Sequence, residues 1–286
     1  MFKKLVILLL VVSMLFVFGA CSPKVETPTP APAPAETPAA TPAPAPAETG
    51  KLADIKKAGK IVLGTAADYP PYEFHKLING EDKIVGFDIE IAKVIAAEIG
   101  VELEIVDMKF DGLLPALVTD DIDFIVAGMV SNEERAKAVD FSIPYYQGRQ
   151  RMIVRAEDKD KFKGPEDLVG QKVGAQKTTL QEEIALEKFA ESEYIGLSKI
   201  TDLVLELENK KIDAVLLVEP VAKAYVSQND KFFLAEIDLG AEDGVSIALN
   251  KGNEKLLEFI DGVLDKMLKD GTIDKFIQEA TILAEE

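Results

Sequence analysis

The sequence predicts an α/β protein made of two lobes with a cleft between them, and three observations support this fold class. Short apolar runs that end at turn residues alternate with longer segments whose apolar residues recur at helical spacing. This alternation is interrupted after residue 128 and starts again at residue 172. Apolar types make up 48% of the 286 residues, which is enough for a substantial core. Strands that alternate with helices are expected to form parallel sheets covered on both faces.

The first unit begins with the apolar run Lys60–Ala66, which predicts a buried strand leading into a Tyr-Pro-Pro turn. Apolar residues at helical spacing then predict a helix over 88–99, and Gly100 is expected to end it. The unit continues with an expected strand over 102–107, a helix over 111–118 and a strand over 123–127.

The second unit repeats this order. Its expected elements are a strand over 172–175, helices over 180–190 and 199–207, a strand over 213–218, a helix over 220–226, a strand over 245–249 and a helix over 254–268. The last helix is strongly amphipathic, and turns around Gly271 are expected to close the chain. Ligands of such sheets bind at the carboxyl ends of the strands, where loops and helix N-termini converge.

The composition argues against several classes of function. Fifty acidic residues against 32 basic ones give a net charge of −18, which is unsuited to binding nucleic acid. One cysteine and one histidine exclude a disulfide framework, a Cys/His zinc site and most Cys–His or Ser–His–Asp chemistry. The glycine motifs that bind phosphate or dinucleotides are also absent. We therefore expect no metal, no cofactor and no catalytic residue.

The N-terminus is typical of an export signal. Lys3 and Lys4 precede an apolar stretch that is too short for a comfortable membrane span. The following Phe18-Gly19-Ala20-Cys21 resembles the bacterial lipobox, which implies cleavage before Cys21 and a diacylglycerol on its sulfur. We expect a signal peptide over 1–20.

A proline-rich stretch follows, with nine of the fifteen prolines between Pro23 and Pro46. Such a segment has little apolar surface to bury and is expected to stay extended. We therefore expect a lipid-anchored linker over 21–50, which would tie the protein to the extracellular or periplasmic side of the cell membrane.

Three strand-to-helix junctions carry candidate binding residues. At the first, two prolines hold Tyr69 rigidly as a flat wall. At the second, Ser131 or Asn132 can cap a helix whose first turn carries Arg135, and free N–H groups beside a guanidinium form a receptor for a carboxylate. The third, over 174–182, again offers N–H groups at a helix start. Each junction also has a purely structural explanation. Tyr69 can be an aromatic residue of the core, Arg135 can form an ion pair at the surface, and the third junction can be an ordinary loop between a strand and a helix.

A longer motif adds a family resemblance. The segment Gly86-Phe87-Asp88-Ile89-Glu90-Ile91-Ala92 resembles the signature of the bacterial family 3 extracellular solute-binding proteins, the polar amino acid receptors of ABC importers. The agreement continues in order and spacing through 110–117, 134–135, 139–142, 144–146, 220–225 and 270–272. It spans essentially residues 51–280.

The resemblance implies a type II periplasmic-binding-protein fold. Lobe 1 would comprise 51–147 and 246–286, and lobe 2 would comprise 148–245. Two crossing segments, near Tyr146–Arg151 and near Gly244–Ala248, would form a hinge, so that a solute captured between the lobes holds the closed form.

The resemblance also implies, position by position, which residues bind the ligand. Tyr69 and Phe110 would sandwich its side chain, and Arg135 would bind its α-carboxylate with help from the N–H groups of Val130 and Leu180. The full expected set is Tyr69, Phe110, Ala127, Gly128, Val130, Arg135, Gln176, Thr179, Leu180, Val218 and Glu219.

Three positions depart from the family pattern. Family members usually hold the ammonium group with Ser or Thr at position 130 and an acid at position 218, and many have an acid at position 66 for cationic side chains. This chain has Val130, Val218 and Ala66. A buried ammonium without a carboxylate costs several kcal/mol. Either Glu219 and Asp68 supply the missing carboxylates, or the ligand is a carboxylate without an α-ammonium.

We therefore expect a monomeric receptor that captures a polar amino acid and delivers it to an ABC permease. A receptor for a non-amino carboxylate is the alternative, and a sensor with the same closed lobes is equally compatible with the sequence. An enzyme of the dehydratase type is a third reading, which would need Glu219 as a general acid.

Overall fold

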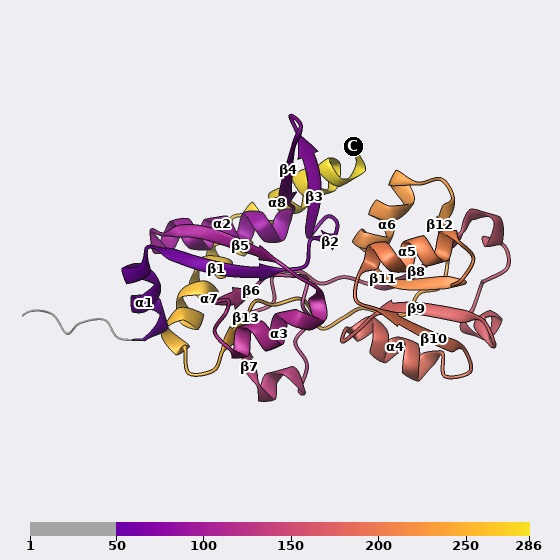
Figure 1. The fold of residues 1–286 in the computed structure, drawn as a ribbon, viewed down its shortest axis with the longest axis horizontal. Coiled ribbons are helices and arrows are strands. Elements are labelled where there is room, and N and C mark those ends of the chain that lie inside the picture. The colour runs from indigo at the N-terminus through magenta and orange to yellow at the C-terminus, as the bar shows by residue number, and fades with distance from the viewer. Residues whose placement is uncertain (1–49) are drawn as a thin grey trace, which may run out of the picture. The chain divides into compact units, whose positions relative to one another are not determined.

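The computed structural model describes residues 50–286. The expected signal peptide, the lipid-attachment residue Cys21 and the linker up to residue 49 lie outside the described residues. The described chain forms two five-stranded sheets and one three-stranded sheet, with helices packed around them (Figure 1).

The first large sheet has the strand order β5-β1-β6-β13-β7. Its strands are β1 (Lys60–Thr65), β5 (Glu102–Asp107), β6 (Phe124–Ile125), β7 (Val139–Phe141) and β13 (Ala248–Asn250). The helices of this part are α1 (Lys51–Ala58), α2 (Phe87–Ile99), α3 (Phe110–Val118), α7 (Glu254–Lys269) and α8 (Thr272–Glu285). We call this part lobe 1.

The second large sheet has the strand order β10-β9-β11-β8-β12, and we call the part built on it lobe 2. Its strands are β8 (Gln150–Arg155), β9 (Lys172–Gln176), β10 (Glu193–Leu197), β11 (Ala214–Val218) and β12 (Phe232–Leu234). Its helices are α4 (Leu180–Lys188), α5 (Ile200–Glu208) and α6 (Glu219–Gln228).

Strand β11 explains why lobe 2 has helices on both faces of its sheet. Val215 and Leu217 pack into the apolar cluster that contains the helix α5 residues, whereas Ala214 and Leu216 pack into the cluster that contains helix α4 residues. Successive side chains of a strand point to opposite faces, so an uninterrupted apolar run buries both.

The expectation of parallel strands is correct for three strands of each sheet. Strands β5, β1 and β6 are parallel in lobe 1, as are β10, β9 and β11 in lobe 2. The other two strands of each sheet add antiparallel pairs. Strands β8 and β13 each enter their sheet directly from the opposite lobe, without the helical crossover that places two strands parallel.

The sequence-based expectation also lacked helix α1 and strands β7, β8, β10 and β12. Two further regions differ from it. A three-stranded sheet, β2 (Asp68–Tyr69), β3 (Glu73–Ile78) and β4 (Glu81–Val85), follows β1 where only a turn was expected. The chain also does not close at Gly271: this residue, at φ +78°, ends the turn after α7, and α8 starts immediately after it.

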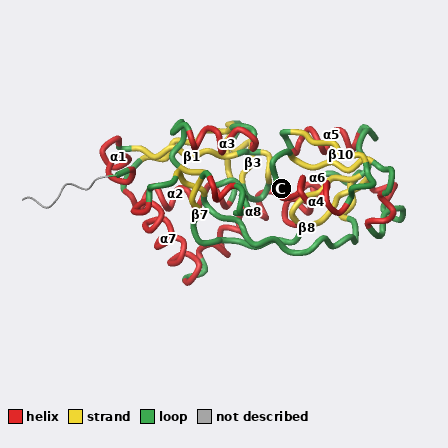
Figure 2. The backbone as a smooth tube through the Cα atoms, turned by 90° about the horizontal axis from the view of Figure 1, so that it is seen from below, coloured by secondary structure: helices red, strands yellow, loops and turns green. Residues whose placement is uncertain are grey.

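Two segments cross between the lobes, in the stretches where the hinge was expected (Figure 2). They pair antiparallel: the N–H of Val245 donates to the carbonyl of Tyr146 at 2.8 Å, and the N–H of Glu242 donates to that of Gly148 at 3.1 Å. The two crossing segments are therefore hydrogen-bonded to each other as well as to the sheets they connect.

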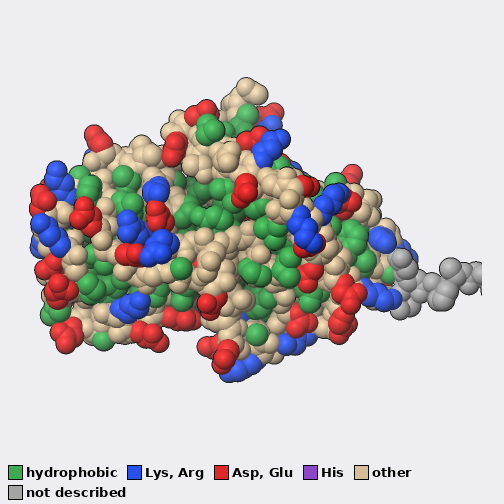
Figure 3. All heavy atoms as spheres, turned by 180° about the vertical axis from the view of Figure 1, so that it is seen from behind, with side chains coloured by type: hydrophobic (Ala, Val, Ile, Leu, Met, Phe, Trp, Pro, Cys, Tyr) green, Lys and Arg blue, Asp and Glu red, His purple; other side chains and the backbone are tan. Residues whose placement is uncertain are grey.

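The face shown in Figure 3 carries acidic and basic side chains interspersed with apolar ones. Many of the charged side chains of the described chain form exposed ion pairs, such as Lys60 with Glu104 and Lys266 with Glu98. Within residues 50–286, every helix is too short or too polar to span a bilayer.

Candidate functional site

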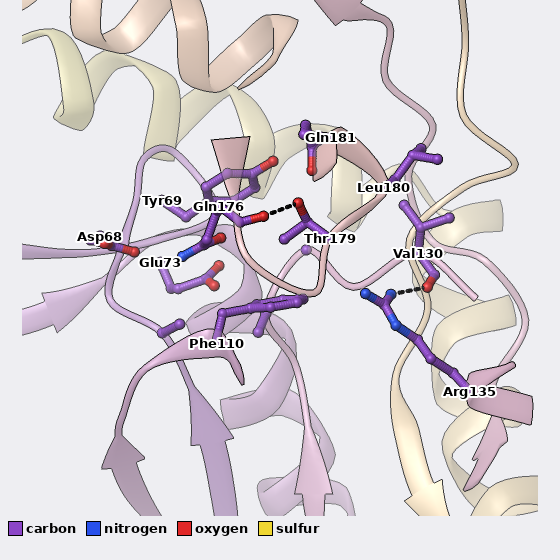
Figure 4. A pocket seen from close by; sticks show the side chains of 13 residues that line it. Asp68, Tyr69, Glu73, Phe110, Val130, Arg135, Gln176, Thr179, Leu180 and Gln181 are labelled. Atoms are coloured by element: carbon purple, nitrogen blue, oxygen red, sulfur yellow. Dashed lines mark hydrogen bonds between the residues drawn. The ribbon is translucent and has the colours of Figure 1, made fainter. Parts of the chain in front are cut away.

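A narrow cavity lies between the lobes and is lined by residues that follow strands β1, β6 and β9 (Figure 4). The lobe 2 side is formed by the end of β9 and the first residues of α4. The full lining is Ala66, Asp68, Tyr69, Glu73, Phe110, Ala127, Gly128, Val130, Arg135, Gln176, Thr179, Leu180 and Gln181.

Nine of the eleven residues expected from the sequence line this cavity. The other two, Val218 and Glu219, do not. Val218 is buried at the end of β11 beside Gly148. Glu219 lines a separate, wider cavity beside the crossing segments, with its carboxylate 2.6 Å from Lys223 Nζ and 4.0 Å from Arg151 Nε.

Arg135 lies at one end of the cavity with only 8% of its surface exposed. Its guanidinium donates to the carbonyls of Val130 and Thr178, one in each lobe. These bonds use two of its five N–H donors. Burial lowers the pKa of Arg135, although an arginine at this position stays charged. The remaining donors can bind a carboxylate in the paired geometry that guanidinium groups favour.

The local structure that holds Arg135 is a 3-10 turn, η1 (Arg135–Lys137), rather than the expected α-helix. The side-chain oxygen of Asn132 accepts the N–H of Arg135 at 2.8 Å. Of the two cap candidates, Asn132 therefore supplies the cap. Its amide nitrogen also donates to Glu183 in lobe 2 at 3.1 Å.

Two aromatic side chains form walls of the cavity. The ring centre of Phe110 lies 5.6 Å from Cζ of Arg135, and Tyr69 packs against Tyr72 with ring centres 5.2 Å apart. Gly128 approaches the Tyr69 ring so closely that a Cβ atom would lie 3.0 Å from it, at a φ of +53° that disfavours other residues.

Lobe 2 closes the cavity with the start of helix α4. The hydroxyl of Thr179 accepts the N–H of Glu182 and donates to the carbonyl of Gln176 at 2.6 Å. Leu180 lines the cavity and occupies the first helical position, where backbone N–H groups have no intrahelical partner. Gln181 donates to Gln150 at 2.8 Å.

Glu73 lies at the other end of the cavity from Arg135, with Phe110 between them (Figure 4). Its side chain is fully buried, and neither carboxylate oxygen has a hydrogen-bond partner of good geometry among residues 50–286. The carboxyl of Asp88 and the backbone of Ala66 nevertheless lie close enough to Glu73 to act on its ionisation. Burial, reinforced by the charges of Asp88 and Asp68, raises the pKa of Glu73 well above its usual value. A cation brought next to this carboxylate would reverse that shift.

Asp68 is the second carboxylate of the lining, and it bridges the lobes. Its Oδ2 accepts the N–H of Ile200, at the start of α5, at 2.7 Å, and its carbonyl accepts the hydroxyl of Tyr225 at 2.9 Å. Burial raises the pKa of Asp68 to about 6. Unlike Glu73, Asp68 therefore already has a partner.

The aspartate of the family signature, Asp88, does not line the cavity but is hydrogen-bonded to residues that hold it in shape. It accepts the N–H of Gly128 at 2.8 Å and the hydroxyl of Tyr145 at 2.9 Å. Burial raises its pKa to about 7, against the opposing effect of these hydrogen bonds. Asp88 thus fixes the turn after β6 that carries Ala127 and Val130.

The lobes touch each other beside the cavity. Besides the bonds of Asp68 and Arg135, Ser198 in lobe 2 donates to Asp111 in lobe 1 at 2.8 Å. Within residues 50–286, no cluster of three or more His, Cys, Asp or Glu side chains could hold a metal ion. The chemistry available at the cavity is therefore recognition of a carboxylate at one end and of a cation at the other.

The comparisons with known proteins agree with this geometry. The model of the bacterial extracellular solute-binding proteins, family 3, matches residues 61–280. This chain belongs to that family. The family expected from the sequence and the two-lobed α/β fold class are thereby confirmed.

Relatives with assigned ligands cover most of the folded part. The arginine-binding extracellular protein ArtP of Bacillus subtilis (strain 168) is 36% identical over 220 residues, covering 76% of this chain and 84% of that protein. A probable histidine-binding protein of Campylobacter jejuni is 34% identical over 221 residues, covering 76% of this chain and 83% of that protein.

Solved structures superpose on the same part. The amino acid ABC transporter substrate-binding protein AbpA from Streptococcus pneumoniae, bound to L-arginine, matches with a TM-score of 0.78 and 35% identity, covering 82% of this chain and 99% of that chain. Holo ArgBP from T. maritima matches with a TM-score of 0.71 and 41% identity, covering 78% and 97%.

Proposed function

We propose that this family member is the receptor of an ABC importer for a cationic amino acid of the arginine type. The capture of an amino acid for ABC import is the function shared by its relatives, and the sequence-based expectation of that function is confirmed. The cationic specificity is the proposal. It is supported by one observation: a single cavity with the guanidinium of Arg135 at one end and the unpartnered carboxylate of Glu73 at the other.

The carboxylate of the solute binds to Arg135 in this proposal. The N–H groups of Val130 and Leu180 assist it, one from each lobe. Charge-assisted hydrogen bonds to a buried guanidinium are roughly twice as strong as neutral ones, and the paired geometry fixes the direction of the ligand. Because the donors come from both lobes, a bound carboxylate stabilises the closed arrangement.

The rest of the solute extends between Tyr69 and Phe110 toward the cluster of Glu73 and Asp68. Aromatic faces attract cations and pack against planar guanidinium groups, so these walls suit an alkyl chain with a positive end. Glu73 would pair with that end. Gln176 and Thr179 would line the lobe 2 side, together with Ala127 and Gly128 on the lobe 1 side.

We leave Val218 and Glu219 out of the proposed binding set, because their side chains are directed elsewhere. Asp68 contributes negative charge near Glu73, but its hydrogen bond to Ile200 commits one of its oxygens to lobe 2. Of the two replacement acids expected from the sequence, the geometry supports Asp68, and it adds Glu73.

A binding role without catalysis is also part of the proposal. A general acid needs a pKa raised toward the working pH. The hydrogen bond from Lys223 lowers the pKa of Glu219, the general acid required by the enzyme alternative. Relatives named as binding proteins support the same reading.

Localisation at the membrane extends the proposal to the N-terminal region. An extracytoplasmic location is common to the family. We propose in addition that residues 1–20 are removed, that Cys21 carries the lipid, and that the linker up to residue 50 tethers a monomeric receptor beside its permease. Mass spectrometry of the protein from membranes would detect the lipid on Cys21, and an unmodified cysteine would contradict the anchoring.

Calorimetric titration tests the proposed ligand class. The panel is L-arginine, its neutral isostere L-citrulline and L-leucine. We expect L-arginine to bind at least tenfold more tightly than L-citrulline, because only L-arginine places a cation beside Glu73. Affinity for L-citrulline equal to or above that for L-arginine would contradict the cationic specificity.

A further inference from the structure

We propose, on the basis of the proposed function, that the cavity recognises a carboxylate and a distant cation, and that an α-ammonium group adds no affinity. The ligand class is then ω-guanidino and ω-amino carboxylates, whether or not they carry an α-amine.

An α-ammonium must lie close to the carboxylate that Arg135 binds. Standard bond lengths and angles place the nitrogen about 2.5 Å from the carboxyl carbon. With the carboxylate on the guanidinium, the ammonium therefore falls among the residues around Arg135 and cannot reach the opposite end of the cavity, where Glu73 lies (Figure 4).

The lining side chains at the Arg135 end offer no carboxylate, and the two carboxylates that act on the guanidinium, those of Glu183 and Glu134, lie outside the lining. Among the described lining residues, those beside the guanidinium are Phe110, Val130 and Leu180, all apolar (Figure 4). The carbonyl of Val130 already accepts from Arg135, as does that of Thr178.

Two other polar side chains near this end already have hydrogen-bond partners. The hydroxyl of Thr179 has both a donor and an acceptor within hydrogen-bond distance, and the amide nitrogen of Gln176 donates to Ser198 at 3.1 Å. The carbonyl of Ala127, expected to accept the α-ammonium, is a single neutral acceptor. An ammonium has three N–H donors and a full charge, so one carbonyl does not replace its lost hydration.

The opposite end holds the carboxylates. Glu73 has two unpartnered oxygens, and Asp68 lies in the same lining. A cation separated from the carboxylate by several bonds reaches these groups, whereas an α-ammonium does not. The cavity therefore distinguishes the two cations of an arginine-like solute by their distance from the carboxylate.

Paired ligands test this directly on the unmodified protein. L-arginine and 5-guanidinopentanoate, which lacks only the α-amine, are titrated by calorimetry at the same pH. We expect the Kd of 5-guanidinopentanoate to be no more than threefold above that of L-arginine, or below it. A Kd more than threefold above that of L-arginine would overturn the inference.

A near-isosteric variant tests the cause. Val130→Thr introduces a hydroxyl acceptor where the α-ammonium would lie, and Val130→Ala is the matched control without one. We expect Val130→Thr to shift the ratio of the two Kd values toward L-arginine by at least threefold relative to Val130→Ala. An unchanged ratio would contradict the claim that a missing acceptor sets this selectivity.

The outcome separates this inference from the proposed function. If L-arginine binds far more tightly than both 5-guanidinopentanoate and L-citrulline, the receptor for cationic amino acids stands and the inference fails. If neither cationic ligand binds more tightly than L-citrulline, the proposed function itself fails.

Discussion

The two ends of the cavity are built in opposite ways. At the Arg135 end the charged group is tied to both lobes, because its guanidinium donates to one carbonyl in each. At the Glu73 end the carboxyl group is fully buried, and it has no hydrogen-bond partner of good geometry within the described chain. Burial raises its pKa, which favours the neutral form. One end is thus organised before a ligand binds, whereas at the other end the ionised form of the carboxyl is unfavourable until a cation lies beside it.

This difference suggests that one end of the cavity provides affinity and the other provides selectivity. A prearranged guanidinium loses little freedom when it binds a carboxylate, so it provides affinity for every solute of the class. An unpartnered carboxylate increases the binding affinity only of solutes that carry a positive charge, so it selects among the carboxylate solutes.

The largest effect is expected at the guanidinium end. Arg135→Met should weaken the binding of every carboxylate solute at least 100-fold, because loss of one partner of a buried charge pair costs about 2–5 kcal/mol or more. Calorimetry with L-arginine and L-leucine measures it. Arg149→Met is the control, since Arg149 is exposed and paired with Asp238 outside the cavity.

A smaller and selective effect is expected at the carboxylate end. Glu73→Gln should weaken L-arginine binding by roughly 10- to 100-fold, as a hydrogen bond to a charged group contributes about 1.5–3 kcal/mol. The affinity for L-citrulline should change little. Glu219→Gln, outside the cavity, should leave both affinities within twofold. Equal losses for L-arginine and L-citrulline in Glu73→Gln would remove the distinction between the two ends.

The buried carboxylate also predicts a pH dependence of stability. The pKa of Glu73 is raised on folding, so between its unfolded value of about 4.5 and its folded value the native state holds a proton that the unfolded state has released. The free energy of unfolding should therefore fall as pH rises through this window.

Denaturant titrations at several pH values measure this effect. The ligand-free wild-type protein should lose about 1.4 kcal/mol per pH unit relative to Glu73→Gln above pH 4.5. Parallel pH profiles for the two proteins would show that Glu73 keeps an ordinary pKa in the fold.

The smallest effect is expected from the cap that orients Arg135. Asn132→Ala should lower the free energy of unfolding by roughly 0.5–2 kcal/mol, as loss of such a cap usually does. It should weaken binding only several-fold, since the guanidinium keeps its bonds to Val130 and Thr178. Asn132→Ser keeps a side-chain oxygen that can accept the N–H of Arg135 without placing a second carboxylate beside Glu183, and it should keep the stability closer to wild type than Asn132→Ala does.

Much of the fold and the guanidinium end could be predicted from the sequence. The strand and helix at each junction have the periodicity and glycine stops that identify such elements. Arg135 follows a strand ending in glycine, and the family motif fixes its position. The antiparallel strands and the small sheet were not predicted, because long-range pairing rather than local pattern creates them.

Glu73 was not predicted as a site residue, because its place in the cavity also depends on long-range strand pairing. In the sequence it is one acid among fifty. Its importance follows from the pairing of β2 with β3, which places Glu73 directly opposite Tyr69 on neighbouring strands. Cross-strand partners share a face, so a predicted hairpin at this turn would have placed Glu73 beside the aromatic wall. The short β2 gives too weak a pattern for that.

Glu219 illustrates the opposite error. It lies one position after the expected acid and before Pro220, which made it a plausible substitute in sequence. In the fold it begins helix α6, where a residue four positions later, Lys223, pairs with it on the helix surface. A shift of one residue past a strand end changes which way a side chain points.

A crystal structure of the protein with bound L-arginine tests the central claim most directly. The account predicts the α-carboxylate on the guanidinium of Arg135 and the side-chain guanidinium on the carboxylate of Glu73, with the chain between Tyr69 and Phe110. A ligand bound in the reverse direction, or one whose guanidinium lies away from Glu73, would contradict it.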